Sequence, residues 1–308
     1  MKKKTGFEKF MSTEKKGAAK KEQFRQEKKQ ITRERKEFFE KKRAEAAGAA
    51  DVKGGKPVPR PAITRAVQEK MPLNKFIAHS GICSRRDAVE LIKNGKAKVN
   101  GEVILEPGHK ISPQDAVTLN GKKINPVKDL VYILINKPKD YITTTDDEKG
   151  RKTVLDLIKN ATKEKVYPVG RLDRNTSGVL LLTNDGDLTQ KLTHPSNEVK
   201  KLYAVTLDKP LTKNHFDEIL KGVPLEDGVA HVDVLAYTDN ADKTQIGIEI
   251  HSGRNRIVRR IFEHYGYDVK NLDRVVFAGL TKKNVDRGKW RFLTEKEVRD
   301  LKYFKKGK

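Results

Sequence analysis

An aspartate between two arginines is the feature of the sequence best suited to chemistry. Asp173 lies in a loop, residues 170–178, where Arg171 and Arg174 flank it and the apolar run 179–182 follows. A carboxylate so placed accepts charge-assisted hydrogen bonds, and reactive groups are usually held on loops that a rigid strand positions. The same pattern is typical of a turn aspartate in a structural ion pair. The pattern alone favours neither interpretation.

A second candidate is the arginine-rich segment at residues 248–266. Arg254, Arg256, Arg259 and Arg260 are interleaved there with apolar residues. On a helix, Arg256 and Arg260 would lie four residues apart on one face. Arginine is favoured where a phosphate or carboxylate is bound with fixed geometry. The segment therefore predicts contact with an anion, and a solvated basic helix is the alternative.

Other candidates for chemistry are weaker. Tyr203 lies in the strand-like segment KKLYAVTL, where a tyrosine is by itself more typical of packing than of catalysis. The seven histidines are scattered, and Cys83 is the only cysteine. No phosphate-binding glycine motif of the GxGxxG or GxxxxGK[ST] type is present. The sequence therefore predicts no metal and no nucleotide cofactor.

The elements that position these residues fall into two groups. The first is a small module, residues 71–128, with two short helical patterns followed by short strands and Gly or Asn-Gly turns. Ser84 and Asp87 have the spacing of a helix capping box. Basic side chains crowd its helical part, which favours nucleic-acid contact over an ordinary solvated face. They are Lys75, Arg85, Arg86, Lys93, Lys96 and Lys98.

The second group is a larger domain, residues 129–308. Its strand-like runs are VYILINKP, VLLLTN, KLYAVTL, TQIGIEI and VVFAGL, with helical patterns at 213–220, 255–264 and 294–301. The two kinds of element alternate irregularly, unlike the repeated units of a doubly wound parallel sheet. We expect an α+β fold with a mixed, mainly antiparallel sheet flanked by helices.

Charge separates a third part from these two. The 308 residues include 66 Lys and Arg against 42 Asp and Glu, a formal net charge of +24. Residues 1–70 hold 22 of the basic and 10 of the acidic side chains. We expect a disordered basic tail there that binds RNA nonspecifically, and a solvated charged helix around residues 22–47 is the alternative.

Composition also excludes several classes of protein. No stretch approaches the roughly 20 apolar residues of a membrane span, and the basic N-terminus lacks the apolar core of a secretory signal. The excess positive charge indicates a polyanionic partner. We therefore expect a soluble, cytoplasmic, monomeric protein.

Five segments then occur in the order of a known family. GRLDRNTSGVLLLTNDG resembles the central motif of pseudouridine synthases, specifically of the branch that modifies uridines in ribosomal RNA, the RsuA/RluB type. ILINKPKDYITTTDD, KKLYAVTL and SGRNRIVRRIF resemble its first catalytic-domain, tyrosine and arginine motifs. LNKFIAHSGICSRRDAVELIKNGKAKVNG resembles its N-terminal S4-like RNA-binding domain. The resemblance covers residues 71 to about 302, with Ser252 and Ile257 standing where glutamate and glutamine are common.

The resemblance implies roles for particular residues. Asp173 matches the aspartate that acts on a flipped-out uridine, Arg259 the arginine that pairs with it, and Tyr203 the tyrosine that stacks on the base. The residues expected to contact RNA are Arg171, Arg254 and Arg256, together with Lys75, Arg85, Arg86 and Lys96 of the S4-like module. The implied reaction is isomerisation of uridine to pseudouridine, without a cofactor or metal. The implied partner is ribosomal RNA, and we expect the 23S RNA within a ribosomal precursor.

Two alternatives remain open at this point. A non-catalytic RNA-binding assembly factor on the same fold would be indicated by a damaged aspartate loop, yet Asp173, Arg259 and Tyr203 are all present. A glycosidase would need a second acid near Asp173. Asp185 and Asp187 are candidates by sequence, although the charge of +24 suits RNA better than a neutral sugar.

Overall fold

The computed structural model describes residues 70–127, 129–239 and 241–303. The predicted basic tail, residues 1–70, lies outside this part of the chain except for its last residue. No helix within the described ranges is long and apolar enough to cross a membrane.

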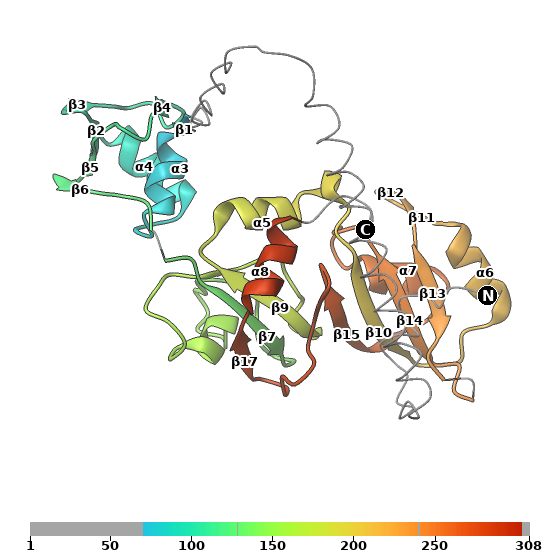
Figure 1. Ribbon diagram of the computed structural model, residues 1–308. Coiled ribbons are helices and arrows are strands. Elements are labelled where there is room, and N and C mark those ends of the chain that lie inside the picture. The colour runs from blue at the N-terminus through green and yellow to red at the C-terminus, as the bar shows by residue number, and fades with distance from the viewer. Residues whose placement is uncertain (1–69, 128, 240, 304–308) are drawn as a thin grey trace, which may run out of the picture. The chain divides into compact units, whose positions relative to one another are not determined.

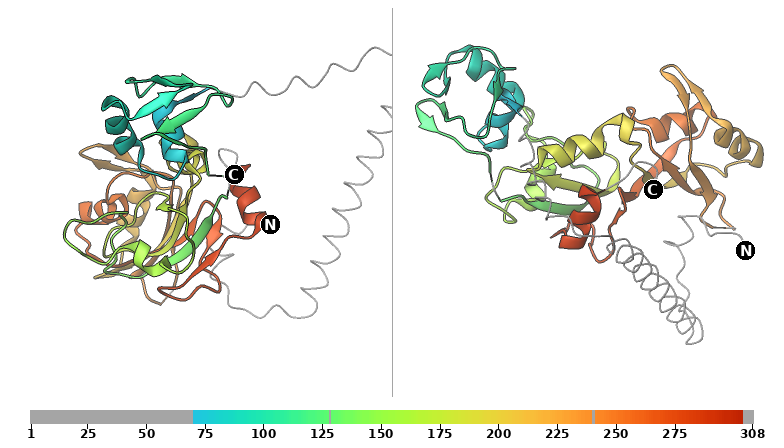
Figure 2. Two further views of the ribbon diagram at one scale, coloured as in Figure 1. Left: turned by 90° about the vertical axis from the view of Figure 1, so that its left-hand side faces the viewer. Right: turned by 45° about the horizontal axis from the view of Figure 1, so that its top comes forward.

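The N-terminal module consists of two helices and a small antiparallel sheet (Figure 2). Its elements are β1 (Met71–Pro72), α3 (Leu73–His79), α4 (Arg85–Lys93), β2 (Ala97–Val99), β3 (Glu102–Val103), β4 (Lys110–Ile111), β5 (Val117–Leu119) and β6 (Lys122–Lys123). The strand order is β3-β2-β5-β6, and β1 pairs separately with β4. Helix α4 begins with the predicted capping box, because the side-chain oxygens of Ser84 and Asp87 each accept a hydrogen bond from the main-chain N–H of the other. The apolar faces of both helices bury Leu73, Ile77 and Ile92 against the sheet.

The larger domain is built on a nine-stranded sheet (Figure 1). Its main path is β13-β14-β10-β15-β9-β7-β17, with β16 attached to β15 and β8 to β9. In chain order these strands are β7 (Tyr132–Lys137), β8 (Tyr167–Pro168), β9 (Ser177–Thr183), β10 (Lys201–Leu207), β13 (Val234–Tyr237), β14 (Gln245–Ile250), β15 (Val269–Phe277), β16 (Leu280–Thr281) and β17 (Trp290–Phe292). Every pairing in this sheet is antiparallel except that of β9 with β15. The predicted α+β fold with a mixed, mainly antiparallel sheet is confirmed.

Helices and a hairpin complete this domain. They are η1 (Val154–Ile158), α5 (Gly186–Thr193), η2 (Pro195–Asn197), α6 (Lys213–Lys221), α7 (Ile257–His264) and α8 (Glu295–Lys302), with the hairpin strands β11 (Val223–Leu225) and β12 (Gly228–Ala230). Helix α7 begins two residues later than the sequence predicted. The cause is Arg256, whose left-handed backbone (φ 47°) makes it the cap residue and not part of the helix.

Strand β9 is buried on both faces, which makes it a rigid support for the loop before it. Leu180 and Leu182 belong to one hydrophobic cluster, which also includes residues of α6 and α7. Val179 and Leu181 belong to the other, which includes residues of α5 and α8. All seven residues of the strand are buried. Its sequence is therefore continuously apolar over residues 179–182 and lacks the alternation of apolar and polar residues that a half-exposed strand shows.

Candidate active site

A large cavity brings together most of the residues predicted to do chemistry, and Arg259 is the exception. Its volume is about 850 Å³, and it lies against the loop before β9. The predicted site residues that line it are Asp173, Tyr203, Arg171, Arg254 and Arg256. They come from three separate parts of the chain, so the fold and not local sequence assembles the cavity.

The two arginines that flank Asp173 have different surroundings. Arg174 forms an exposed ion pair with Asp140, with 3.2 Å between its Nη2 and Oδ1. Arg171 is exposed at the cavity and has no ion pair within the described residues. Arg171 is thus the one of the pair that is available to a ligand.

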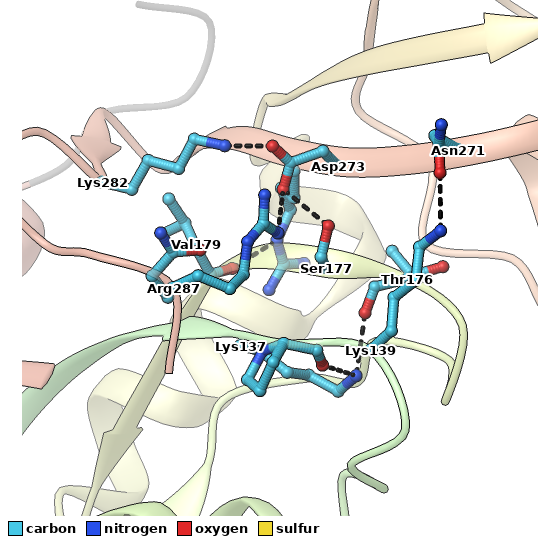
Figure 3. Close-up of polar contacts among 12 residues, drawn as sticks. Lys137, Lys139, Thr176, Ser177, Val179, Asn271, Asp273, Lys282 and Arg287 are labelled. Carbon is cyan, nitrogen blue, oxygen red and sulfur yellow. Dashed lines mark hydrogen bonds and ion pairs between the residues drawn. The ribbon is translucent and has the colours of Figure 1, made fainter. Parts of the chain in front are cut away.

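A buried lysine that the sequence analysis missed holds the loop of Asp173 from beneath (Figure 3). Lys137, the last residue of β7, donates from Nζ to the carbonyl oxygens of Pro138, Asp173, Arg174 and Thr176 at 2.8–3.2 Å. Burial lowers the pKa of its ammonium to about 8, although nearby carboxylates oppose the shift. One cation therefore organises three carbonyl groups of the Asp173 loop and that of Pro138.

Strand β15 braces the end of the same loop. Ser177 donates from Oγ to Oδ1 of Asp273 at 2.9 Å. Lys282 and Arg287 both pair with the Asp273 carboxylate, and Figure 3 shows this cluster above β9. Asp273 thereby connects the first residue of β9 to two cations of the segment after β15.

Close contact between β9 and β15 requires glycine at position 178. Gly178 is paired with Arg274 in the parallel register and has φ +111°. A Cβ atom there would lie 2.2 Å from the carbonyl oxygen of Arg274. Arg274 also donates from Nε to the carbonyl oxygen of Val179 at 2.8 Å. Any side chain at position 178 would push the two strands apart.

Arg259 lies behind the loop, 8% exposed, on α7. It donates from Nη1 to the carbonyl oxygen of Val269 at 2.8 Å and from Nη2 to that of Asn175 at 3.2 Å. Burial and the charge of Arg256 lower its pKa, while the Asp173 carboxylate opposes this shift. Within the described residues Asp173 has no ion pair, so direct pairing with Arg259 stays a prediction.

Arg254 lines the cavity, but its hydrogen bonds are made to a neighbouring element, the β11–β12 hairpin. Its guanidinium donates to Oδ1 of Asp227 at 2.8 Å and to carbonyl oxygens of the β11–β12 hairpin at 2.8–2.9 Å. Arg260 binds the same carboxylate from α7 at 2.7 Å. Asp227 thus joins the hairpin to the arginine segment. The hairpin places Val229, which is 52% exposed, at the cavity.

Two further residues of the predicted site lie on the wall of the cavity. Tyr203 is 9% exposed on β10. Arg256 is exposed, and its Nη2 lies 3.2 Å from Oε1 of Glu263.

Lys201, two residues before Tyr203, donates from Nζ to the carbonyl oxygens of Val199 and His251 at 2.7 and 2.6 Å. Burial lowers the pKa of Lys201 to about 8, and the charge of Arg274 adds to the shift.

In the N-terminal module, the predicted RNA-contacting residues differ in what they already bind. Arg85 and Arg86 are exposed in the first turn of α4, and Lys96 is exposed just before β2. None of these three has an ion pair within the described residues. Lys75 on α3 instead places its Nζ 2.6 Å from Oδ1 of Asp187.

The two carboxylates considered for a glycosidase do not line the cavity. Asp185 caps α5, accepting a hydrogen bond from the main-chain N–H of Leu188, and its other oxygen accepts from the hydroxyl of Tyr132. Asp187 is the partner of Lys75. Across the described ranges, no cluster of three or more His, Cys, Asp or Glu side chains could hold a metal ion.

The site therefore consists of the Asp173 carboxylate in a cavity lined by several arginines, with the buried Tyr203 on its wall. Arginines at the rim suit the phosphates of a polynucleotide, and a volume of about 850 Å³ can hold an extruded nucleotide. The arrangement is therefore able to present one carboxylate to a base or sugar that has left its helix.

Comparison with known proteins agrees with this geometry. The family described as RNA pseudouridylate synthase matches residues 131–264, and the S4 domain matches residues 71–117. "Ribosomal large subunit pseudouridine synthase B" of Bacillus subtilis (strain 168) is 42% identical over 75% of this chain and 95% of that protein. "Dual-specificity RNA pseudouridine synthase RluF" of Escherichia coli (strain K12) is 37% identical over 74% of this chain and 77% of its own. A crystal structure of a pseudouridylate synthase superposes with a TM-score of 0.54 at 26% identity, covering 75% of this chain and 99% of that one.

Proposed function

The chain belongs to the RNA pseudouridylate synthase family, and from that membership we propose that it converts uridine to pseudouridine in ribosomal RNA with Asp173 as the essential group. Its domains are then the S4-like RNA-binding domain at residues 71–128 and the catalytic domain at 129–308, after the basic tail at 1–70. The observation that carries the proposal is the position of Asp173 on a rigidly held loop, at a cavity lined by arginines and Tyr203.

The reaction is an isomerisation. The N1–C1′ glycosidic bond breaks, the uracil turns, and C5 forms a bond to C1′ while C5 loses a proton and N1 gains one. Asp173 acts on the extruded nucleotide, Tyr203 stacks on its base, and Arg259 holds the aspartate loop. Extrusion from a folded RNA costs a few kcal/mol, which contacts from Arg171, Arg256 and the S4-like domain offset.

The target we propose is the large-subunit RNA, 23S in bacteria, within a ribosomal precursor. The support is the 42% identity to a protein named for the large ribosomal subunit. We also propose that the protein works as a monomer in the cytoplasm. Sedimentation of the purified protein with and without RNA tests the monomeric state.

Conversion of an RNA transcript tests the activity. Wild-type protein is incubated, without an added cofactor, with separate 23S and 16S transcripts, and pseudouridine is mapped by carbodiimide-dependent primer extension. We expect one defined site in the 23S transcript. Conversion only of the 16S transcript would contradict the proposed target, and conversion of neither would contradict the proposed function.

Asp173→Asn is the matched variant for that assay. It keeps the size of the side chain but removes its charge. We expect turnover to vanish while RNA affinity stays within roughly tenfold, or about 1.4 kcal/mol. Appreciable turnover by the purified variant would exclude Asp173 as the essential group.

A further inference from the structure

Arg274 is a buried cation at the catalytic cavity that none of the roles above uses. It lies on β15, 3% exposed, and lines the cavity that Asp173 and Tyr203 share. Its Nε atom donates to the carbonyl oxygen of Val179, and its Cζ atom lies 4.5 Å from the centre of the Phe277 ring. One edge and one face of the guanidinium are thus fixed.

One nitrogen of the guanidinium lacks a partner. Nη2 of Arg274 is buried and makes no hydrogen bond within the described residues. Buried donors are nearly always satisfied in native proteins, and charged ones are the most costly to leave unpaired. An exception of this kind at a catalytic cavity points to a bond that is completed in another state of the site.

Tyr203 is the side chain placed to complete it. Tyr203 and Arg274 face each other across the antiparallel pair of β10 and β15. Burial lowers the pKa of Arg274, and the charge and hydrogen-bonding influence of the Tyr203 side chain oppose that shift. The phenol therefore lies just outside strict hydrogen-bond geometry with the guanidinium. Hydrogen bonds of catalytic groups are often long without substrate and tighten in the complex.

We propose that Arg274 is the positioning residue for Tyr203, with Nη2 donating to the Tyr203 hydroxyl when the extruded uridine occupies the cavity. The contact fixes the plane of the phenol ring relative to β9, because the same guanidinium is already bonded to Val179 of that strand. The base stacked on Tyr203 is thereby held in register with Asp173. The inference rests on the proposed function, since it assigns Arg274 a part in the same reaction.

A double-mutant cycle tests the proposal. Arg274→Lys, Tyr203→Phe and the double variant are compared with wild type in single-turnover reactions at saturating enzyme on the 23S transcript. Arg274→Lys keeps the charge but loses the forked donor, so we expect its rate constant to fall about 10- to 100-fold, the range for a hydrogen bond to a charged group. In the Tyr203→Phe background the same change should cost less than about threefold, because the hydroxyl is already gone. The Kd for RNA should stay within about threefold throughout.

A purely structural brace would behave differently. Equal fold losses from Arg274→Lys in both backgrounds, or no loss in either, would overturn the proposal. Arg291→Lys is the matched control, because Arg291 is a half-buried arginine of the same sheet that binds Glu297 far from the cavity. Its rate constant should be unchanged.

The experiment also distinguishes the proposal from a folding defect and from failure of the proposed function. If thermal unfolding shows that Arg274→Lys does not fold, Tyr203→Phe alone should still lower the rate about 10- to 100-fold because it removes the acceptor, and an unchanged rate would overturn the proposal. If wild-type protein converts no uridine, the proposed function fails together with this inference. If wild type converts uridine and the cycle is additive, this inference alone fails.

Discussion

Arg259 holds the loop of Asp173 through main-chain carbonyl groups, and this contact makes a specific prediction. Arg259→Lys keeps a cation but cannot reach both Val269 and Asn175 with a planar fork. We expect turnover at saturating RNA to fall at least about tenfold, while affinity changes by less than about threefold. Single-turnover rates and binding isotherms on the same transcript provide the measurement. Weaker binding with unchanged turnover would assign Arg259 to RNA binding instead.

Lys137 makes the corresponding prediction from the other side of the loop. Lys137→Met preserves most of the volume and removes the donor that four carbonyl oxygens share. Leaving buried carbonyl groups unpaired should lower the free energy of unfolding by about 1–3 kcal/mol. Denaturant unfolding measures this loss, and turnover should fall with RNA affinity nearly unchanged. Lys139→Met is the control, because Lys139 is exposed and its one hydrogen bond within the described residues goes to Asn271. Equal stability of Lys137→Met and wild type would contradict the anchoring role.

The role of a single residue can be predicted from the sequence when its partners lie close to it in the chain. The capping box of Ser84 and Asp87 could be predicted because four consecutive residues contain the whole interaction. Asp173 could be selected because its loop is locally unusual. Lys137 could not, because a lysine that ends an apolar run is the same in sequence whether it faces solvent or four carbonyl groups. Arg274 was missed because its partners lie on β9 and β10.

Among the elements, helix α8 offers a test by pH. Arg291 of β17 binds Glu297 of α8 through both nitrogens at 2.7–2.8 Å. This pair, followed by the cap at Thr294, lowers the pKa of Glu297 from its usual 4.5 to about 2. The unfolded chain therefore binds more protons between those values, so the stability from this pair is complete above pH 4.5 and lost as pH falls towards 2.

The expected contribution is up to about 2 kcal/mol after allowance for solvent screening. Denaturant unfolding of wild type and Glu297→Gln from pH 6 to pH 2 provides the measurement. The difference in unfolding free energy should be largest at pH 6 and disappear near pH 2. A difference that is constant over this range would contradict the role of the charged pair.

Elements with apolar periodicity could be predicted, and those held by polar contacts could not. β7, β9, β10 and β14 correspond to apolar runs of the sequence. Strand β15 is longer than its predicted run, because Asn271 and Asp273 interrupt the apolar pattern at the point where it touches β9. The β11–β12 hairpin was also missed, although Asp227-Gly228 is a hairpin signal. Its place at the cavity depends on Arg254 and Arg260, which are distant in sequence.

At the scale of the whole molecule, we predict that the positive charge of residues 1–70 raises the affinity for RNA without contributing to turnover. Residues 1–70 carry a net charge of +12, half of the total of +24, and contain none of the residues matched to the catalytic motifs. Each phosphate contact adds about 0.7–0.9 to the slope of log affinity against log salt. Deletion of residues 1–70 should therefore weaken binding at low salt and flatten that slope, with turnover at saturating RNA and the modified uridine unchanged. A deletion variant that folds but modifies a different uridine would show that the tail takes part in recognition.

The clamp of Lys137 on the loop of Asp173 has a consequence for which uridines can react. Fixing a backbone residue costs about 1–2 kcal/mol of conformational entropy, and here folding has already met that cost for the loop. If Asp173 acts as proposed, this loop has little left to organise when RNA arrives, and we expect the barrier to a productive complex to lie in the RNA. Selection among uridines becomes a comparison of how easily each leaves its helix. A mispaired or bulged uridine would be modified faster than a well-stacked one in the same sequence context.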